Sequence, residues 1–121
     1  MKIETGERAF LAGAIAMTIG LTLVAMTPSS ATIFPSTLHV PVHVLVYAML
    51  AFAWARALPR VPALVLMLAG VALGFTHEAL EIAGHRHPFE IADACYDATG
   101  IVVGVIMARF TKRKERATEA R

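Results

Sequence analysis

The stretch AFLAGAIAMTIGLTLVAMT, residues 9–27, contains no charged side chain. About 20 apolar residues in a helix are needed to cross a hydrocarbon core of about 30 Å. Three further apolar stretches of similar length follow, at residues 39–58, 62–82 and 91–110. None alternates apolar with polar residues, and four segments are too few to close a β-barrel. The sequence therefore predicts an all-α integral membrane bundle of four transmembrane helices joined by short loops.

The composition supports lipid as the solvent of this chain. Its 121 residues are 57% hydrophobic and 17% charged, with a mean hydropathy of +0.64, whereas soluble domains are about 45–50% apolar. We predict one membrane domain over residues 1–121, ending in a basic cytoplasmic tail at 111–121. Cys95 is the single cysteine, which excludes an internal disulfide. No basic groove-reading motif is present, so no nucleic-acid partner is expected.

The first apolar stretch has an alternative interpretation as a signal peptide. Lys2 and Arg8 resemble a basic start, and Ser29-Ser30-Ala31 resembles a cleavage site. The apolar run is longer than the roughly 7–15 residues usual in signal peptides. We therefore expect this stretch to be retained as the first transmembrane helix.

Lysine and arginine residues predict the orientation of the bundle. Four crossings place the N-terminus, the second loop and the C-terminus on one side of the membrane. That side holds ten of the eleven basic residues: Lys2, Arg8, Arg56, Arg60, Arg109, Lys112, Arg113, Lys114, Arg116 and Arg121. The other side holds only Arg86. Because cytoplasmic loops are enriched in Lys and Arg, we expect both termini in the cytoplasm of a bacterial cell and the chain in its inner membrane.

Polar residues recur at helical spacing in the second, third and fourth stretches. They form His43-xxx-Tyr47, then Gly74-xxx-Glu78-xx-Glu81, and finally His87-Pro88-Phe89-Glu90-Ile91-Ala92-Asp93-xxx-Asp97-xx-Gly100-xxx-Gly104. In these motifs the chain resembles the VanZ-like family of small bacterial membrane proteins, over roughly half its length. Glu81 stands where the family usually has Gln, Asp97 where it has Asn, and His87 at the usual Arg position. The resemblance implies a cell-envelope protein linked to resistance against teicoplanin-type glycopeptide antibiotics, and it supplies no reaction.

The acidic residues point to a cluster inside the bundle. A charged group at mid-membrane costs about 2.5–3.5 kcal/mol on insertion scales, so such groups face the bundle interior and pair. A rise of about 1.5 Å per residue places His43, Glu78 and Asp97 within about 4 Å of one depth, in the outer half. We predict that these three interact, with Asp93 at the mouth. We also predict that Asp97 is neutral or shares a proton with His43.

Two sets of candidate residues follow from these patterns. The ligand-binding candidates are His43, Tyr47, Glu78, Glu81, Arg86, His87, Asp93 and Asp97, and the helix-packing candidates are Gly74, Gly100 and Gly104. His77 and Glu81 have the i, i+4 spacing at which two side chains share one metal ion. A polar His77 facing a cavity explains the same pattern, so we expect no resident metal or cofactor.

The sequence leaves several functions open. The first is a protein that binds an amphiphile at the outer face, either a lipid-linked cell-wall component or a lipoglycopeptide. The second is an intramembrane hydrolase or transferase that uses the same acids and histidines for acid–base chemistry. A structural scaffold and a small transporter are further alternatives, and a four-helix transporter would need to oligomerise. Membrane lipid is an expected partner in each case, a homo-oligomer is compatible with all of them, and enzymatic activity stays open.

Overall fold

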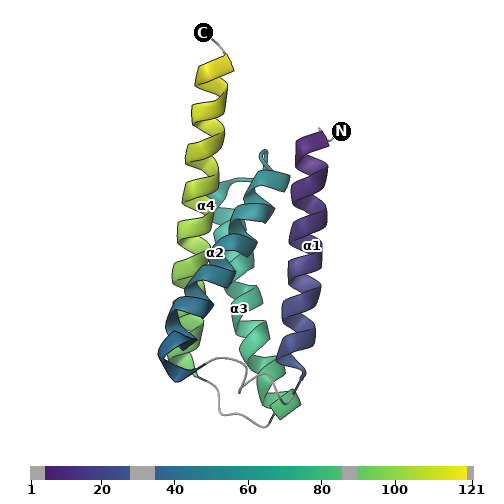
Figure 1. The fold of residues 1–121 in the computed structure, drawn as a ribbon, viewed down its shortest axis with the longest axis vertical. Coiled ribbons are helices and arrows are strands. Elements are labelled where there is room, and N and C mark those ends of the chain that lie inside the picture. The colour runs from purple at the N-terminus through teal and green to yellow at the C-terminus, as the bar shows by residue number, and fades with distance from the viewer. Residues whose placement is uncertain (1–4, 28–34, 86–89, 120–121) are drawn as a thin grey trace.

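Four α-helices form the bundle in the computed structural model, which describes residues 5–27, 35–85 and 90–119. They are α1 (Thr5–Ala25), α2 (His39–Ala57), α3 (Ala63–His85) and α4 (Ile91–Glu119), and a 3-10 turn, η2 (Ser36–Leu38), leads into α2. The helices run up and down, so that the two termini lie at the same end (Figure 1). All four are long and apolar enough to cross a membrane. The all-α prediction is confirmed, and the chain is a multi-pass membrane protein.

Local features of the sequence explain where the helices begin and end. Pro41 lies in the first turn of α2, where its missing N–H costs no helical hydrogen bond. Between α2 and α3, the Leu58 N–H bonds to the Trp54 carbonyl at 2.9 Å, and the Leu66 N–H bonds to the Pro62 carbonyl at 3.2 Å. Pro62 therefore lies directly before α3. The loop between these helices is short, as the sequence predicts.

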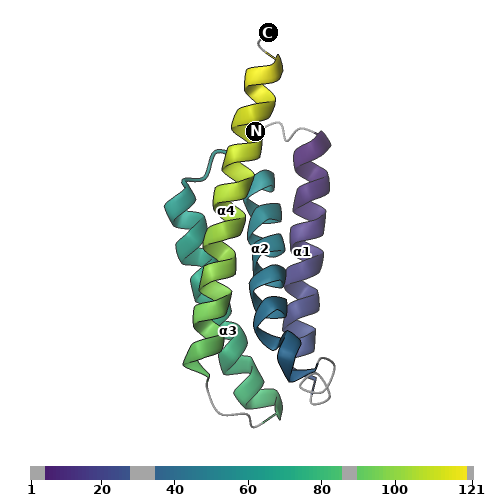
Figure 2. The same ribbon diagram turned by 60° about the vertical axis from the view of Figure 1, so that its left-hand side comes forward.

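The fourth helix is longer than the predicted membrane span at 91–110. It continues to Glu119 and extends past the other helices at the end that carries the termini (Figure 2). Residues 111–119 contain no Gly or Pro and consist mostly of good helix formers, which favours this continuation. The basic tail is thus helical over its described part. The other helices differ from the predicted spans by a few residues: α1 begins at Thr5, and α3 extends to His85.

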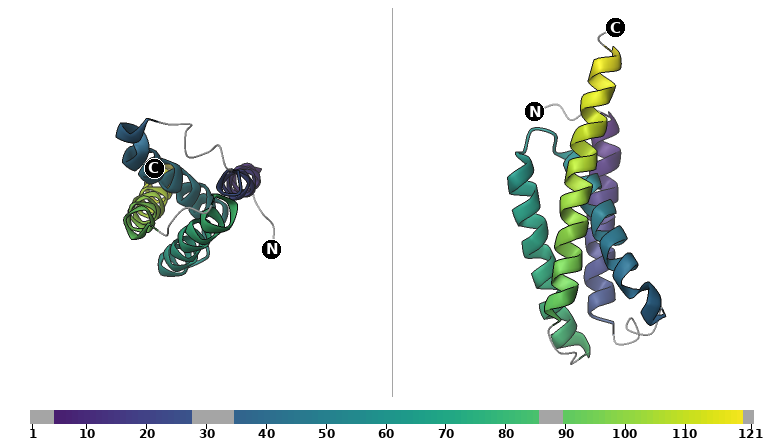
Figure 3. Two further views of the ribbon diagram at one scale, coloured as in Figure 1. Left: turned by 90° about the horizontal axis from the view of Figure 1, so that it is seen from below. Right: turned by 90° about the vertical axis from the view of Figure 1, so that its left-hand side faces the viewer.

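The core of the bundle lies between α2 and α4. These two helices make the closest contact in the molecule, and α1 packs against α2 away from α4, as the end-on view in Figure 3 shows. The buried apolar cluster consists of Tyr47, Leu50, Ala51, Ala55, Ile101, Val105 and Ala108. Large apolar side chains on the outside, such as Leu64, Leu68 and Phe110, are 62–70% exposed. This outer surface suits contact with lipid.

Threonine hydroxyl groups inside the spans bond to carbonyl oxygens of their own helices. Thr18 donates to the Ala14 carbonyl at 2.8 Å, Thr76 to Ala72 at 2.8 Å and Thr99 to Cys95 at 2.8 Å. Because lipid offers no hydrogen-bond partner, such i to i−4 bonds remove the cost of placing a hydroxyl in the membrane.

Candidate functional site

A histidine of α2 and an aspartate of α4 form the centre of a polar cluster. His43 Nδ1 lies 2.8 Å from Asp97 Oδ1, at hydrogen-bond distance, and the Asp97 side chain is fully buried. The two residues are 54 positions apart in the sequence. Both belong to the end of the bundle opposite the termini, because α2 and α4 both begin there (Figure 1).

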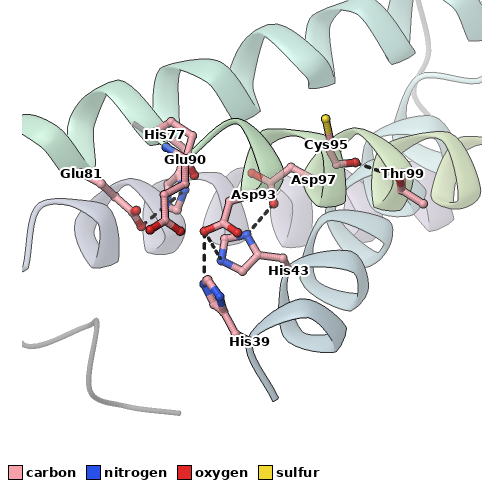
Figure 4. Close-up of polar contacts among 10 residues, drawn as sticks. His39, His43, His77, Glu81, Glu90, Asp93, Cys95, Asp97 and Thr99 are labelled. Atoms are coloured by element: carbon pink, nitrogen blue, oxygen red, sulfur yellow. Dashed lines mark hydrogen bonds and ion pairs between the residues drawn. The ribbon is translucent and has the colours of Figure 1, made fainter. Parts of the chain in front are cut away.

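One helical turn further out, a second His–Asp pair forms the mouth of the cluster. Asp93 Oδ2 lies 3.3 Å from His39 Nε2 and 3.9 Å from His43 Nε2. The His39 side chain is 48% exposed, whereas that of Asp93 is 7% exposed. Figure 4 shows the two histidines of α2 facing the two aspartates of α4. The histidine rings also stack edge to face, with centroids 4.6 Å apart.

The third helix supplies the other side of the cluster. His77 and Glu78 are buried there, and the Tyr47 ring of α2 packs edge to face against the His77 ring at 6.0 Å. The Glu90 backbone N–H donates to Glu78 Oε2 at 3.3 Å. Glu81, whose side chain is 23% exposed, contacts His77 only at 3.9 Å. Figure 4 places His77, Glu81 and Glu90 together beside Asp93.

Several polar atoms of this cluster have no hydrogen-bond partner. Among the described residues, the buried side-chain atoms without one are Tyr47 Oη, both ring nitrogens of His77, Glu78 Oε1 and Asp97 Oδ2. The Tyr47 hydroxyl neighbours the Asp97 carboxylate without reaching hydrogen-bond geometry. Leaving a buried polar group unpaired costs about 1–3 kcal/mol. Their concentration at one place indicates a site that is completed by a ligand, by water or by protons.

Among the described residues, two groups of side chains lie close enough together to hold a metal ion. In the first, His39, His43 and Asp93 bring one ligand atom each within 4.8 Å of one another. In the second, His77, Glu78 and Asp97 do the same, and all three are buried. His77 and Glu81, which the sequence offers only as weak metal candidates, do not form one of these groups. His77 keeps its 3.9 Å contact with Glu81, and the packing of α4 on α3 adds Asp97 beside His77 and Glu78.

An apolar cavity of about 340 Å³ lies between the helices on the side of the termini. Its lining comes from all four helices and the residue after α2: Thr18, Leu50, Ala51, Trp54, Leu58, Leu66, Ala69, Gly70, Leu73, Ile101 and Val105. Thr18 and Leu73 also line a small gap of about 20 Å³ that reaches Tyr47 and His77. The cavity is thus adjacent to the polar cluster, and the volume falls within the range of about 300–1,000 Å³ usual for ligand pockets.

The predicted packing glycines lie at the contacts that bring the cluster together. A Cβ at Gly104 would overlap the Ala48 carbonyl oxygen, and one at Gly100 would overlap the Val44 carbonyl oxygen. A Cβ at Gly74 would lie 3.3 Å from Asp97 Cβ. These glycines allow α4 to approach α2 and α3 closely enough for Asp97 to reach His43.

The structure brings together most of the predicted ligand-binding residues but not all of them. His43, Tyr47, Glu78, Asp93 and Asp97 are all buried or half-buried within the cluster, and Glu81 is at its edge. Arg86 and His87 lie outside the described residues.

Sequence reasoning gave too little weight to two histidines of the cluster. It left His39 out of the candidates, although the His39-xxx-His43 spacing could have identified it. It also assigned His77 only a weak metal role with Glu81. The backbone N–H of Glu90 carries no sequence signal and could not have been found.

Comparison of the chain with models of protein families, with curated proteins and with solved structures gave no match. The fold and the site define a four-helix, multi-pass membrane protein with a polar cluster inside one end of the bundle.

Proposed function

We propose that this protein binds an amphiphilic component of the bacterial envelope, with the polar head at the cluster and the apolar chain in the adjacent cavity. The observation that carries the proposal is that the cavity and the cluster are adjacent. Thr18 and Leu73 line both the apolar cavity and the gap that reaches Tyr47 and His77. A molecule with one polar end and one apolar end matches this arrangement, whereas a wholly polar solute matches only half of it.

The direction of the site fits a lipid of the outer leaflet. The polar cluster lies at the end away from the termini, and the cavity extends toward the termini as far as Trp54 and Leu58. With both termini in the cytoplasm of a bacterial inner membrane, as ten of the eleven basic residues favour, the cluster faces the periplasm. An acyl chain that enters from the outer leaflet then runs from the cluster toward the middle of the membrane.

The side chains of the cluster favour a head group that donates hydrogen bonds. Glu78, Asp93 and Asp97 are acceptors when ionised, and an imidazole can accept through one nitrogen. Sugar hydroxyls, amides and amines offer such donors. Lipid-linked cell-wall components and lipoglycopeptides carry these groups on an apolar anchor. The resemblance to the VanZ-like family favours the same class of ligand and a role in resistance to glycopeptide antibiotics.

A filled cavity tests the proposal. We expect Leu73→Trp to remove the amphiphile that co-purifies with the wild-type protein in mild detergent, as measured by native mass spectrometry. The matched control is Leu64→Trp on the same helix, where the side chain is 65% exposed on the outer surface. This control should keep the ligand. Equal ligand occupancy in wild type and Leu73→Trp, or no co-purifying amphiphile in any sample, would contradict the proposal.

The cellular role has a separate test. Deletion of the gene should increase sensitivity to teicoplanin-type glycopeptides, and wild type and Leu64→Trp should restore resistance while Leu73→Trp should not. Membrane levels of each variant, measured by immunoblotting, control for loss of the protein. Unchanged sensitivity to all glycopeptides after deletion would refute the resistance role.

One observation favours an acid–base enzyme as the second candidate. A carboxylate bonded to one imidazole nitrogen holds the ring in place, as Asp97 does for His43 at 2.8 Å, and leaves the other nitrogen for proton transfer. The single cysteine, Cys95, is exposed and lies on a different face of α4 from Asp97, so it does not serve as a nucleophile in this cluster. A hydrolase or transferase here would use an activated water. Turnover of the co-purified amphiphile by wild type but not by His43→Gln would distinguish it from a binding protein.

A further inference from the structure

We propose that His77, Glu78 and Asp97 form a binding site for a divalent transition-metal ion, with Zn²⁺ as the first choice. One ligand atom from each residue lies within 4.8 Å of the other two. All three residues are more than nine-tenths buried, with exposed fractions of 8%, 2% and 0%. The proposal shares Glu78 and Asp97 with the proposed head-group site, but it rests on these three side chains and not on the apolar cavity.

The two carboxylates show the same arrangement of partners. Asp97 Oδ1 is bonded to His43, and Glu78 Oε2 accepts the Glu90 N–H. The second oxygen of each, Asp97 Oδ2 and Glu78 Oε1, has no hydrogen-bond partner. Metal-ligating carboxylates are commonly held in this way, with one oxygen bonded to a neighbouring group. The His77 ring nitrogens also lack a hydrogen-bond partner, so each residue retains an atom for the ion.

Charge gives a second, independent reason for a cation. Two ionised carboxylates buried side by side repel each other, and each loses its hydration. Among the described residues, all Lys and Arg side chains lie in the half of the bundle that carries the termini or in its tail, far along the helices from this site. With the imidazoles of His77 and His43 both neutral, a divalent ion and the two carboxylates make a site with no net charge.

The donor set favours a transition metal over Mg²⁺ or Ca²⁺. One imidazole nitrogen and two carboxylate oxygens suit Zn²⁺, which binds His and Asp or Glu in tetrahedral sites, whereas Mg²⁺ and Ca²⁺ prefer oxygen ligands alone. Zinc bonds of about 2.0–2.2 Å place neighbouring ligand atoms about 3.3–3.5 Å apart. The present separations are at most 4.8 Å, so small side-chain rotations complete the site. Three protein ligands leave a fourth position open for water or for a head group.

The proposal is tested on the full-length protein with Cys95→Ser as the background, which removes the exposed thiol as an adventitious zinc ligand. Zinc is added to chelator-treated protein in detergent, and the dissociation constant is measured by competition with a chromophoric chelator. We expect about one Zn²⁺ per chain and a zinc-dependent increase in the unfolding temperature. His77→Gln and Glu78→Gln should each weaken binding at least about tenfold, because even outer-shell partners of a metal contribute about 10–100-fold. Mg²⁺ should produce no shift.

Two controls locate the ion. Glu81→Gln removes the acid four residues after His77. His39→Ala removes one member of the outer group, which consists of His39, His43 and Asp93. Both variants should leave the affinity for zinc unchanged. Without zinc, Glu78→Gln should unfold at the same temperature as its parent or higher, since it removes a buried charge. A zinc affinity that falls with Glu81→Gln or His39→Ala but not with Glu78→Gln would overturn the site. Absence of any zinc-dependent shift would overturn it too, and retention of the amphiphile by that same protein would leave the proposed function intact.

Discussion

His43 and Asp97 show how a buried acid is accommodated in a membrane protein. Asp97 has no exposed surface, and His43 Nδ1 lies 2.8 Å from its Oδ1. An ionised aspartate in this position without a partner would carry a large desolvation cost. The neighbouring pair, His39 and Asp93, needs its contact less, because the His39 side chain is 48% exposed and reaches solvent or head groups. The two His–Asp pairs should therefore differ in what they contribute to stability.

We predict that His43→Ala lowers the free energy of unfolding by about 1–3 kcal/mol, the cost of leaving a buried polar group unpaired. His39→Ala should cost less than about 1 kcal/mol, because the His39 side chain is half exposed and an ion pair with an exposed partner contributes little. Thermal or denaturant unfolding in detergent, followed by circular dichroism, measures both. Equal losses of unfolding free energy for the two variants would show that burial of Asp97 does not strengthen its contact with His43.

The same pair can be dissected with a conservative variant. Asp97→Asn removes the charge, keeps an oxygen near His43 Nδ1, and should be tolerated for folding. In that background His43→Ala should cost less than in wild type, because no buried charge is left without a partner. A double-mutant cycle of unfolding free energies gives the difference. Additive effects of the two substitutions would mean that the contact carries no coupling energy.

At the scale of helices, α4 is the element that organises the molecule. Its glycines lie against α2 near the polar cluster, and its continuation beyond the membrane contacts the other helices at the opposite end. There Lys112 pairs with Glu7 of α1 at 3.2 Å and Glu115 with Arg56 of α2 at 2.8 Å. The Arg109 guanidinium donates to the carbonyls of Pro59 and Val61, in the loop between α2 and α3. One helix thus fixes the positions of the other three.

Close packing at the glycines predicts a position-dependent effect of a single methyl group. Gly104→Ala and Gly100→Ala should each destabilise the bundle by about 1–3 kcal/mol, because the new Cβ overlaps a carbonyl oxygen of α2 and forces the helices apart. Gly13→Ala and Gly20→Ala in α1 are the controls, since a Cβ there meets nothing within 4 Å. These should be neutral or stabilising by up to about 1 kcal/mol, because alanine favours the helix. Similar unfolding temperatures for all four variants would contradict the packing argument.

The Arg109 contacts predict a specific need for a guanidinium. Arg109→Lys keeps the charge but cannot donate to two carbonyls from one planar group, so we expect it to lose about 1–2 kcal/mol of stability, nearly as much as Arg109→Ala. Arg113→Ala, at an exposed position one turn further along α4, should have no effect. If Arg109→Lys kept full stability, a positive charge alone would be sufficient at this position.

At the scale of the whole molecule, the described basic residues and the polar cluster lie at opposite ends of the bundle. The Lys and Arg residues that the structure describes lie toward the termini, and the acids and histidines of the cluster gather where α2 and α4 begin and α3 ends. This asymmetry predicts the topology in the membrane. A reporter fused after Lys114 should be active in the cytoplasm, and one inserted near Ser36 or His87 should be active in the periplasm. Paired phosphatase and fluorescent-protein fusions measure this, and a periplasmic C-terminus would reverse the placement of the site.

Much of this arrangement was predictable because the information is local. Crossing a membrane depends on the length and hydropathy of one segment, so the four apolar stretches suffice to predict four helices. Depth follows from position along a helix, so His43, Glu78 and Asp97 could be placed in one layer before any contact was known. The acids had to face the interior, since lipid cannot solvate them.

Rotation and tilt of the helices depend on side chains far apart in the chain, and here only the tertiary structure decides. The sequence pairs His77 with Glu81 by spacing, and the two lie 3.9 Å apart, but only the packing of α3 on α4 brings Asp97 close to His77 and Glu78. The Glu7–Lys112 pair joins residues 105 positions apart, and no local pattern marks it. The apolar cavity beside the cluster is lined by residues that come from all four helices. A cavity depends on how the surfaces of several helices fit together, so the hydropathy of a single segment cannot predict it.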